Sequence, residues 1–140
     1  MTATTNDVTC DMFGDCQEFA CLFSERTGNH FSGKIDREFI IKMVNDELEE
    51  LRQAKDETEE VDALLDAVYY ILNHLATTGL DIRPVWKLIH DANMTKFGPG
   101  GYKREDGKWC KPPNSVPPDD EIRKVIENQR RLDKNEHLRE

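Results

Sequence analysis

The sequence predicts an all-α protein, an antiparallel bundle of four to five helices forming one domain over residues 1–140. Two observations support this fold class. Apolar residues recur at three- and four-residue spacing through several segments, which is the period of an amphipathic helix. Two such segments are joined by only the polar residues 55–57, and a connection this short makes neighbouring helices antiparallel. An elongated helical chain of this length often completes its core with a partner.

The first helix is expected over residues 8–24, after a flexible N-terminus at residues 1–7. Its apolar stripe consists of Phe13, Cys16, Ala20 and Phe23. Glycines at positions 28 and 33 then interrupt the helical pattern and predict a loop.

Two longer helices follow, over residues 36–54 and 58–77. Asp36 is the expected N-cap of the first and Thr58 that of the second, and Gly79 ends the pair. Each helix has an apolar face that we expect to be buried. On the first it comprises Ile35, Phe39, Met43 or Val44, Leu48 and Leu51, and on the second Val61, Leu64, Leu65, Val68, Leu72 and Leu75.

The C-terminal half is expected to contain two further helices. Asp81 and Pro84 begin one of them, and its core face includes Val85, Leu88 and Ile89. Residues 98–118 are rich in glycine and proline and predict a basic loop. A charged helix over residues 119–140, capped by Asp119 or Asp120, completes the domain.

The charge and the apolar pattern exclude two kinds of partner. The formal charge of −9 argues against general nucleic-acid binding, since such affinity comes from Lys and Arg on phosphates. No apolar run approaches the ~20 residues that span a bilayer, and the N-terminus lacks the pattern of a signal peptide. The four cysteines follow no zinc-binding spacing and read as free thiols, so we expect a cytoplasmic protein.

Acidic side chains follow one side of each central helix. Asp46, Glu47 and Glu50 lie within roughly 60° of one another around a helix, and Glu59, Asp62 and Asp66 follow the same spacing. Folding the pair about Asp56 places Glu50 opposite Asp62, and Asp46 or Glu47 opposite Asp66. Converging carboxylates repel one another unless cations lie between them or some are protonated. Oxygen ligands of this kind favour Mg²⁺, Mn²⁺ or Ca²⁺.

These residues resemble the all-α nucleoside triphosphate pyrophosphohydrolases, and most closely the MazG-like branch that is similar to phosphoribosyl-ATP pyrophosphohydrolase. The resemblance runs from Phe13 to Pro118. Glu47 and Glu50 match the family's ExxE turn, and Asp46 stands where some members carry an extra acid. The second turn departs from a strict ExxD, because Ala63 stands three residues before Asp66. Asp62 and Asp66, with Glu59 third, are the ligands that the resemblance implies there.

The segment HDANMTKFG also resembles this branch, at the end of its last core helix. It implies that Asn93 and Lys96 contact the substrate, whereas His90 is more often a packed residue than a base. Lys103, Arg104, Lys108 and Lys111 lie on the basic loop. They read either as a lid that neutralises a triphosphate or as a plain basic surface.

The resemblance implies an enzyme that cleaves a nucleoside triphosphate between its α- and β-phosphates, releasing pyrophosphate. Mg²⁺, or Mn²⁺, is the implied cofactor, held by Glu47, Glu50, Asp62, Asp66 and Glu59. Glu47 or Asp46 would orient or deprotonate the attacking water. The resemblance also implies a homodimer or homotetramer. Two alternatives stay open: phosphoribosyl-ATP pyrophosphohydrolase itself, and a non-catalytic helical interaction module.

Overall fold

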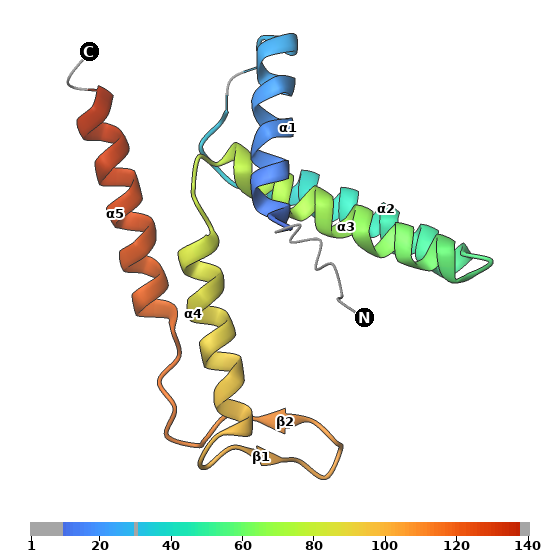
Figure 1. The fold of residues 1–140 in the computed structure, drawn as a ribbon, viewed down its shortest axis with the longest axis vertical. Helices are drawn as coiled ribbons and strands as arrows, with labels where there is room; N and C mark the ends of the chain where they lie inside the picture. The colour runs from blue at the N-terminus through green and yellow to red at the C-terminus, as the bar shows by residue number, and fades with distance from the viewer. Residues whose placement is uncertain (1–9, 30, 138–140) are drawn as a thin grey trace, which may run out of the picture. The chain divides into compact units, whose positions relative to one another are not determined.

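The computed structural model describes residues 10–29 and 31–137, and it confirms the all-α class (Figure 1). The helices are α1 (Met12–Thr27), α2 (Arg37–Gln53), α3 (Glu57–Thr77), α4 (Arg83–Met94), the 3₁₀ helix η1 (Thr95–Phe97) and α5 (Asp119–His137). The chain divides into two compact units, and the boundary in the sequence falls between Gly79 and Leu80. The expected flexible segment 1–7 and the last residues of the predicted C-terminal helix lie outside the described residues.

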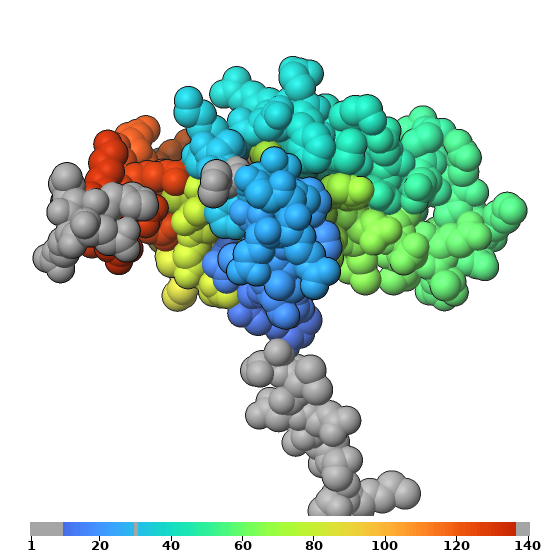
Figure 2. Space-filling model, turned by 90° about the horizontal axis from the view of Figure 1, so that it is seen from above, coloured from blue at the N-terminus to red at the C-terminus, as the bar shows by residue number. Residues whose placement is uncertain are grey.

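The first unit is a helical hairpin of α2 and α3 with α1 packed against it. Figure 2 shows the paired helices as one bar, with α1 lying against the part away from their turn. The buried apolar side chains are Phe13, Cys16 and Ala20 of α1 and Ala63, Ala67 and Ala76 of α3, and Thr78 at the end of α3 is buried as well. Between α1 and α3, the Phe19 ring meets the edge of Tyr69, and Cys16 Sγ lies 3.9 Å from the Tyr69 carbonyl oxygen.

The turn between α2 and α3 is held by two acidic side chains. Asp56 caps α3, because its Oδ1 accepts a hydrogen bond of 2.9 Å from the Glu59 N–H. Glu59 reaches back, and its Oε2 accepts from the Lys55 N–H at 2.8 Å. The arrangement differs from a capping box in one respect, because Glu59 accepts from the residue before the N-cap and not from the N-cap itself. The cap predicted at Thr58 was therefore wrong, because the helix begins one residue earlier, at Glu57. The predicted cap of α2 is confirmed, since Asp36 accepts from the Phe39 N–H.

The predicted apolar face of α3 is not buried within the first unit. Val61, Leu64 and Leu65 are 49%, 48% and 56% exposed, and Val68 is also exposed. Phe39 and Leu48 of α2 are exposed as well, as is Ile35, which lies just before that helix. Helical spacing groups the large apolar residues of α3 on one stripe. The residues that α3 buries are its alanines and not this stripe. The stripe is left as an apolar surface on the hairpin.

The second unit contains α4 and α5, which pack on each other, and a short two-stranded ribbon. Gln129 of α5 joins the start of α4 through two hydrogen bonds, accepting from the Asp81 N–H and donating to the Asp81 carbonyl, both at 2.9 Å. Pro84 lies in the first turn of α4, as predicted. Asp119 and Asp120 both lie inside the first turn of α5.

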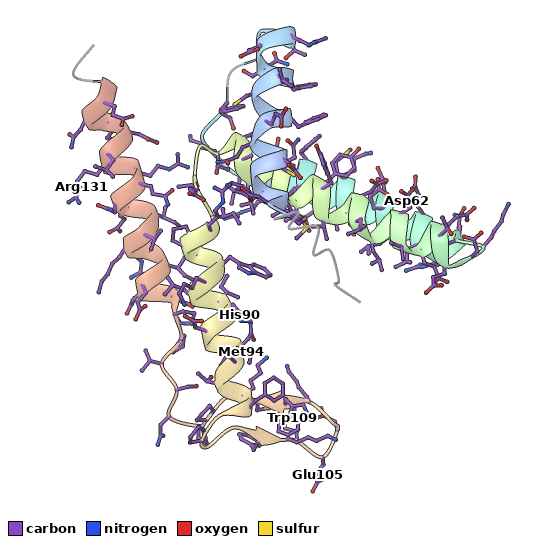
Figure 3. All side chains as sticks on the ribbon, in the orientation of Figure 1. Asp62, His90, Met94, Glu105, Trp109 and Arg131 are labelled. Carbon is purple, nitrogen blue, oxygen red and sulfur yellow. The ribbon has the colours of Figure 1, made fainter. Side chains whose placement is uncertain are left out.

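The ribbon was not predicted and corrects the expectation of a loop without regular structure at residues 98–118. Strands β1 (Tyr102–Lys103) and β2 (Trp109–Cys110) pair antiparallel, with Tyr102 opposite Cys110. Figure 3 shows Glu105 at the tip of this ribbon and Trp109 on β2. Gly107 adopts a φ of 88° in the turn, a conformation that side chains rarely allow. None of the described helices has the length and hydrophobicity of a membrane-spanning segment.

Replacing Asp56 with alanine should lower the free energy of unfolding by about 1 kcal/mol, because α3 loses its N-cap. Urea denaturation of both proteins at one protein concentration measures the change. Thr58→Ala is the matched control and should have a much smaller effect. An equal loss in the two variants would contradict the assignment of the cap.

Candidate active site

The centre of the candidate site is Glu47, a glutamate on the inward side of α2. It is only 9% exposed, and its Oε2 has no hydrogen-bond partner among the described residues. Loss of hydration raises the pKa of this carboxyl above its ordinary value. The nearby carboxyls of Glu50, Asp66 and Asp62 raise the pKa of Glu47 further, and Glu50 contributes most among them.

The structure thus brings together four of the carboxylates that the sequence singled out. Glu47 and Glu50 come from α2, and Asp62 and Asp66 from α3. Figure 3 places Asp62 on the half of α3 nearer the turn. Glu47 and Asp66 line one cavity of about 240 Å³, whose other walls are Phe19, Tyr69, Tyr70 and Asn73. The helical spacing placed either Asp46 or Glu47 opposite Asp66, and in the structure it is Glu47 that shares a cavity with Asp66.

Two other candidate acids point elsewhere. Asp46 lies in solvent, where its carboxylate forms an ion pair of 3.0 Å with Lys42 one turn away. Glu59 is engaged in the α2–α3 turn through the Lys55 N–H. Neither contributes to the field that shifts the pKa of Glu47. The cluster around Glu47 therefore comprises Glu50, Asp62 and Asp66.

The cluster is not preformed as a metal cage. Among residues 10–29 and 31–137, no three His, Cys, Asp or Glu side chains are arranged to hold an ion as they stand. Glu50, Asp62 and Asp66 are exposed, so they can rotate at little cost, whereas Glu47 is fixed by burial. One fixed and three adjustable carboxylates are a suitable donor set for a hard cation.

The predicted substrate-binding residues all belong to the second unit. Asn93 is exposed on α4, and its Nδ2 donates to the Ile89 carbonyl of the same helix. Lys96 lies in η1, and Lys103 in β1. Arg104 forms an ion pair with Asp106 across the ribbon turn, which raises the pKa of Arg104 and lowers that of Asp106.

Lys111 follows β2 and is half-buried, and Lys108 precedes it. His90 is exposed on α4 (Figure 3). The ribbon is thus a basic element, but Asp106 neutralises part of its charge internally.

Sequence reasoning missed Asn73 and the aromatic residues of the cavity. The signal was available, because Tyr70 and Asn73 follow Asp66 by four and seven positions and so share its side of α3. An amide in an apolar helix resembles an ordinary exposed position until its surroundings are known.

The family model of phosphoribosyl-ATP pyrophosphohydrolase matches residues 16–93, which is more than half of the 140 residues. The chain belongs to the phosphoribosyl-ATP pyrophosphohydrolase family. This family is part of the MazG-like superfamily of all-α nucleoside triphosphate pyrophosphohydrolases, as the sequence resemblance predicts. Comparison with curated proteins and with solved structures gave no significant match.

Membership of the phosphoribosyl-ATP pyrophosphohydrolase family supports a pyrophosphohydrolase activity for this chain. The matched segment contains the whole carboxylate cluster and ends at Asn93. Lys96 and the basic ribbon lie beyond it. The carboxylates are therefore part of the segment shared with the family, whereas the ribbon is outside it.

The raised pKa of Glu47 predicts how stability depends on pH when no divalent cation is present. Between the unfolded value, about 4.3, and the raised folded value, the folded chain binds more protons than the unfolded chain. The stabilisation is complete below the unfolded pKa and is lost as pH rises through the folded pKa. In EDTA, the free energy of unfolding should therefore fall across this window, and Glu47→Gln should flatten the fall.

Urea denaturation at a series of pH values measures this dependence. Glu49→Gln is the matched control, since Glu49 is an exposed glutamate on the same helix. A slope that persists unchanged in Glu47→Gln would show that Glu47 is not the titrating group.

Proposed function

We propose that this protein hydrolyses a nucleoside or deoxynucleoside triphosphate between the α- and β-phosphates, giving the monophosphate and pyrophosphate. The observation that carries the proposal is the buried Glu47 among three further carboxylates, inside the segment that matches the family. Several acids at one place are a poor surface for a triphosphate unless cations intervene. The proposal therefore includes a divalent metal.

We propose Mg²⁺ as the cofactor, with Mn²⁺ as a substitute. The residues fit such an ion, because Glu47 Oε2 is buried without a partner among the described residues and the donors are all carboxylate oxygens. Glu47, Glu50, Asp62 and Asp66 would hold it, and Glu59 would join only by leaving the α2–α3 turn. When bound, the metal supplies charge neutralisation and a water of lowered pKa.

The chain's own groups would position the substrate and the water. The Glu47 oxygen that is not used in coordination would orient or deprotonate the attacking water. Asp46 remains the alternative base, but its partner is Lys42 in solvent. Lys96, Lys103, Arg104 and Lys111 would neutralise the phosphates, and Asn93 would hydrogen-bond to the substrate.

The family match favours a second candidate substrate, phosphoribosyl-ATP itself. The same carboxylates could serve either substrate, because both carry the same phosphoanhydride. We also propose that the protein works in the cytoplasm, which suits its free cysteines Cys10, Cys16, Cys21 and Cys110. Parallel turnover assays on phosphoribosyl-ATP and on the common nucleotides separate the two substrates.

We propose further that the chain is a homodimer or homotetramer. The support is the exposed apolar stripe on α3, which includes Val61, Leu65 and Val68. Several large apolar side chains on one helix face are a costly surface for a monomer and a common one for an interface.

Replacing either Glu50 or Asp66 with alanine should lower pyrophosphate release by roughly 100-fold or more, because the site loses a metal donor. A coupled pyrophosphate assay with Mg²⁺ measures this, and circular dichroism should show unchanged helicity. Glu49→Ala on the exposed side of α2 should keep full activity.

Mg²⁺ should also raise the melting temperature of the unaltered protein, since a ligand that binds only the folded state stabilises it. Full activity in both Glu50→Ala and Asp66→Ala would overturn the proposal. No activity and no melting shift in the unaltered chain would favour a non-catalytic helical module.

Leu65→Lys should convert the oligomer to a monomer, because a charge would be buried in the proposed interface. Light scattering measures the mass of the particle in solution. Gln53→Lys, also at an exposed position on the hairpin, is the matched control and should leave the mass unchanged. A monomeric unaltered protein would contradict the oligomer.

A further inference from the structure

A histidine joins the α1–α2 loop to the end of α3. His74 lies in the last turn of α3, and its Nε2 accepts a hydrogen bond of 3.0 Å from the backbone N–H of Asp36. The two residues are 38 positions apart in the sequence. In Figure 1 the loop reaches the start of α2 beside the end of α3. This bond depends on the state of the imidazole, because Nε2 can accept only when it carries no proton.

The loop itself can change its path. Gly28 and Gly33 adopt φ values of 70° and 68°, in the left-handed region that favours glycine. Small residues of this kind often serve as hinges, since they absorb changes of backbone angle. Other hydrogen bonds of the loop are local, such as the one that the Ser32 hydroxyl donates to the Lys34 carbonyl at 3.1 Å. The bond to His74 differs from these, because it ties the loop to another helix.

The charged groups around His74 are few. Among the described residues that line a cavity of about 470 Å³ together with His74, the titratable ones are Asp36 at the start of α2 and Tyr70 on α3 itself. From α1, this cavity is lined by the uncharged residues Phe19, Ala20, Phe23 and Ser24. The charged neighbours of Asp36 in the sequence line a separate depression, and they are Lys34, Arg37 and Glu38. Asp36 is therefore the charged group that faces His74.

Protonation would set His74 against the group that it now joins. An imidazolium donates from both nitrogens, so its Nε2–H would face the Asp36 N–H. The Asp36 carboxylate attracts the added charge, but its Oδ1 already accepts from the Phe39 N–H at 3.1 Å as the cap of α2. The imidazolium must therefore either turn away or compete with α2 for that carboxylate. In both cases the hydrogen bond from the Asp36 N–H to α3 is lost.

We propose that His74 is a pH-sensitive switch, which holds the α1–α2 loop on α3 when neutral and releases it when protonated. Histidine is the side chain that ordinarily gains its proton between about pH 8 and pH 5. The bond is therefore made at the upper end of this range and lost as the pH falls through it. The switch is a property of the folded chain, so it does not depend on the proposed function.

Release of the loop would alter the surroundings of the candidate site. Asn29, Phe31 and Ser32 of the loop are walls of the 470 Å³ cavity. This cavity shares other walls with the carboxylate cavity, namely Phe19, Tyr70 and Asn73. Protonation of a single side chain on α3 would thus open a wall next to the carboxylates without touching any of them.

The test follows the Asp36 amide in the isotope-labelled full chain, without metal or substrate. Its protection from solvent exchange, corrected for the intrinsic pH dependence of exchange, should fall by roughly 10-fold between about pH 8 and pH 5. A local measurement is needed because Glu47 makes global stability depend on pH as well. The imidazole nitrogen shifts of His74 should show, at the higher pH, a proton on Nδ1 and none on Nε2.

Four variants assign the response to His74. His74→Gln should remove the pH dependence, because a glutamine oxygen can accept the same bond and does not titrate. His74→Phe should leave the Asp36 amide poorly protected at every pH. Asp36→Asn keeps a good N-cap and should keep the response, which separates His74 from the Asp36 carboxylate. His90→Gln is the matched control, since His90 is an exposed histidine of α4, and it should change nothing.

Three results would overturn the switch. They are a proton on Nε2 of His74 at the higher pH, an Asp36 amide that is unprotected there, and a response that persists unchanged in His74→Gln. The first two come from the unaltered protein, so they hold even if His74→Phe does not fold. Glu50→Ala should keep the response while it loses hydrolysis, which makes failure of the switch distinct from failure of the proposed function.

Discussion

The close antiparallel contact between α2 and α3 is the constraint on which the rest of this structure depends. It brings Glu47 under cover while Asp62 and Asp66 approach from the opposite helix. An isolated carboxylate in such a place would lose hydration, and three like-charged neighbours add repulsion. The fold therefore carries an electrostatic cost at one position. Nothing in the packing of the hairpin itself requires that cost, which is why it indicates a binding role.

The α2–α3 turn explains how the contact is held in register. The Asp56 carboxylate accepts from the Glu59 N–H, and the Glu59 carboxylate accepts from the Lys55 N–H. The turn is therefore fixed by two hydrogen bonds from backbone N–H groups. These two acids belong to the same helical hairpin as the cluster acids, but they have a different role. Acids at a helix N-terminus satisfy backbone donors, whereas acids further along face the neighbouring helix.

Helical spacing predicted the helices and placed Asp46 or Glu47 opposite Asp66, because both depend only on the 3.6-residue period and a short turn. It could not predict which apolar stripe of α3 packs inside the unit. Leu65 and Ala63 are both acceptable core residues. Which of the two is buried depends on how closely α1 and α2 approach α3. The ribbon of Tyr102 and Cys110 was missed for another reason. Two-residue strands have no periodicity, so the glycine and proline around them predict only a loop.

The position of Asn73 ties the two parts of the candidate site together. In the proposed function, the carboxylates and their metal would interact with phosphate through charge, and charge is the same for every nucleotide. Selectivity must therefore come from groups that contact the base or sugar, and such groups need a dry, fixed surface to act on. Phe19, Tyr70 and Asn73 line both the carboxylate cavity and a neighbouring cavity of about 470 Å³, so they are candidates for such contacts. Because the acids would respond to charge alone, residues that choose among substrates are expected on these cavity walls rather than among the acids.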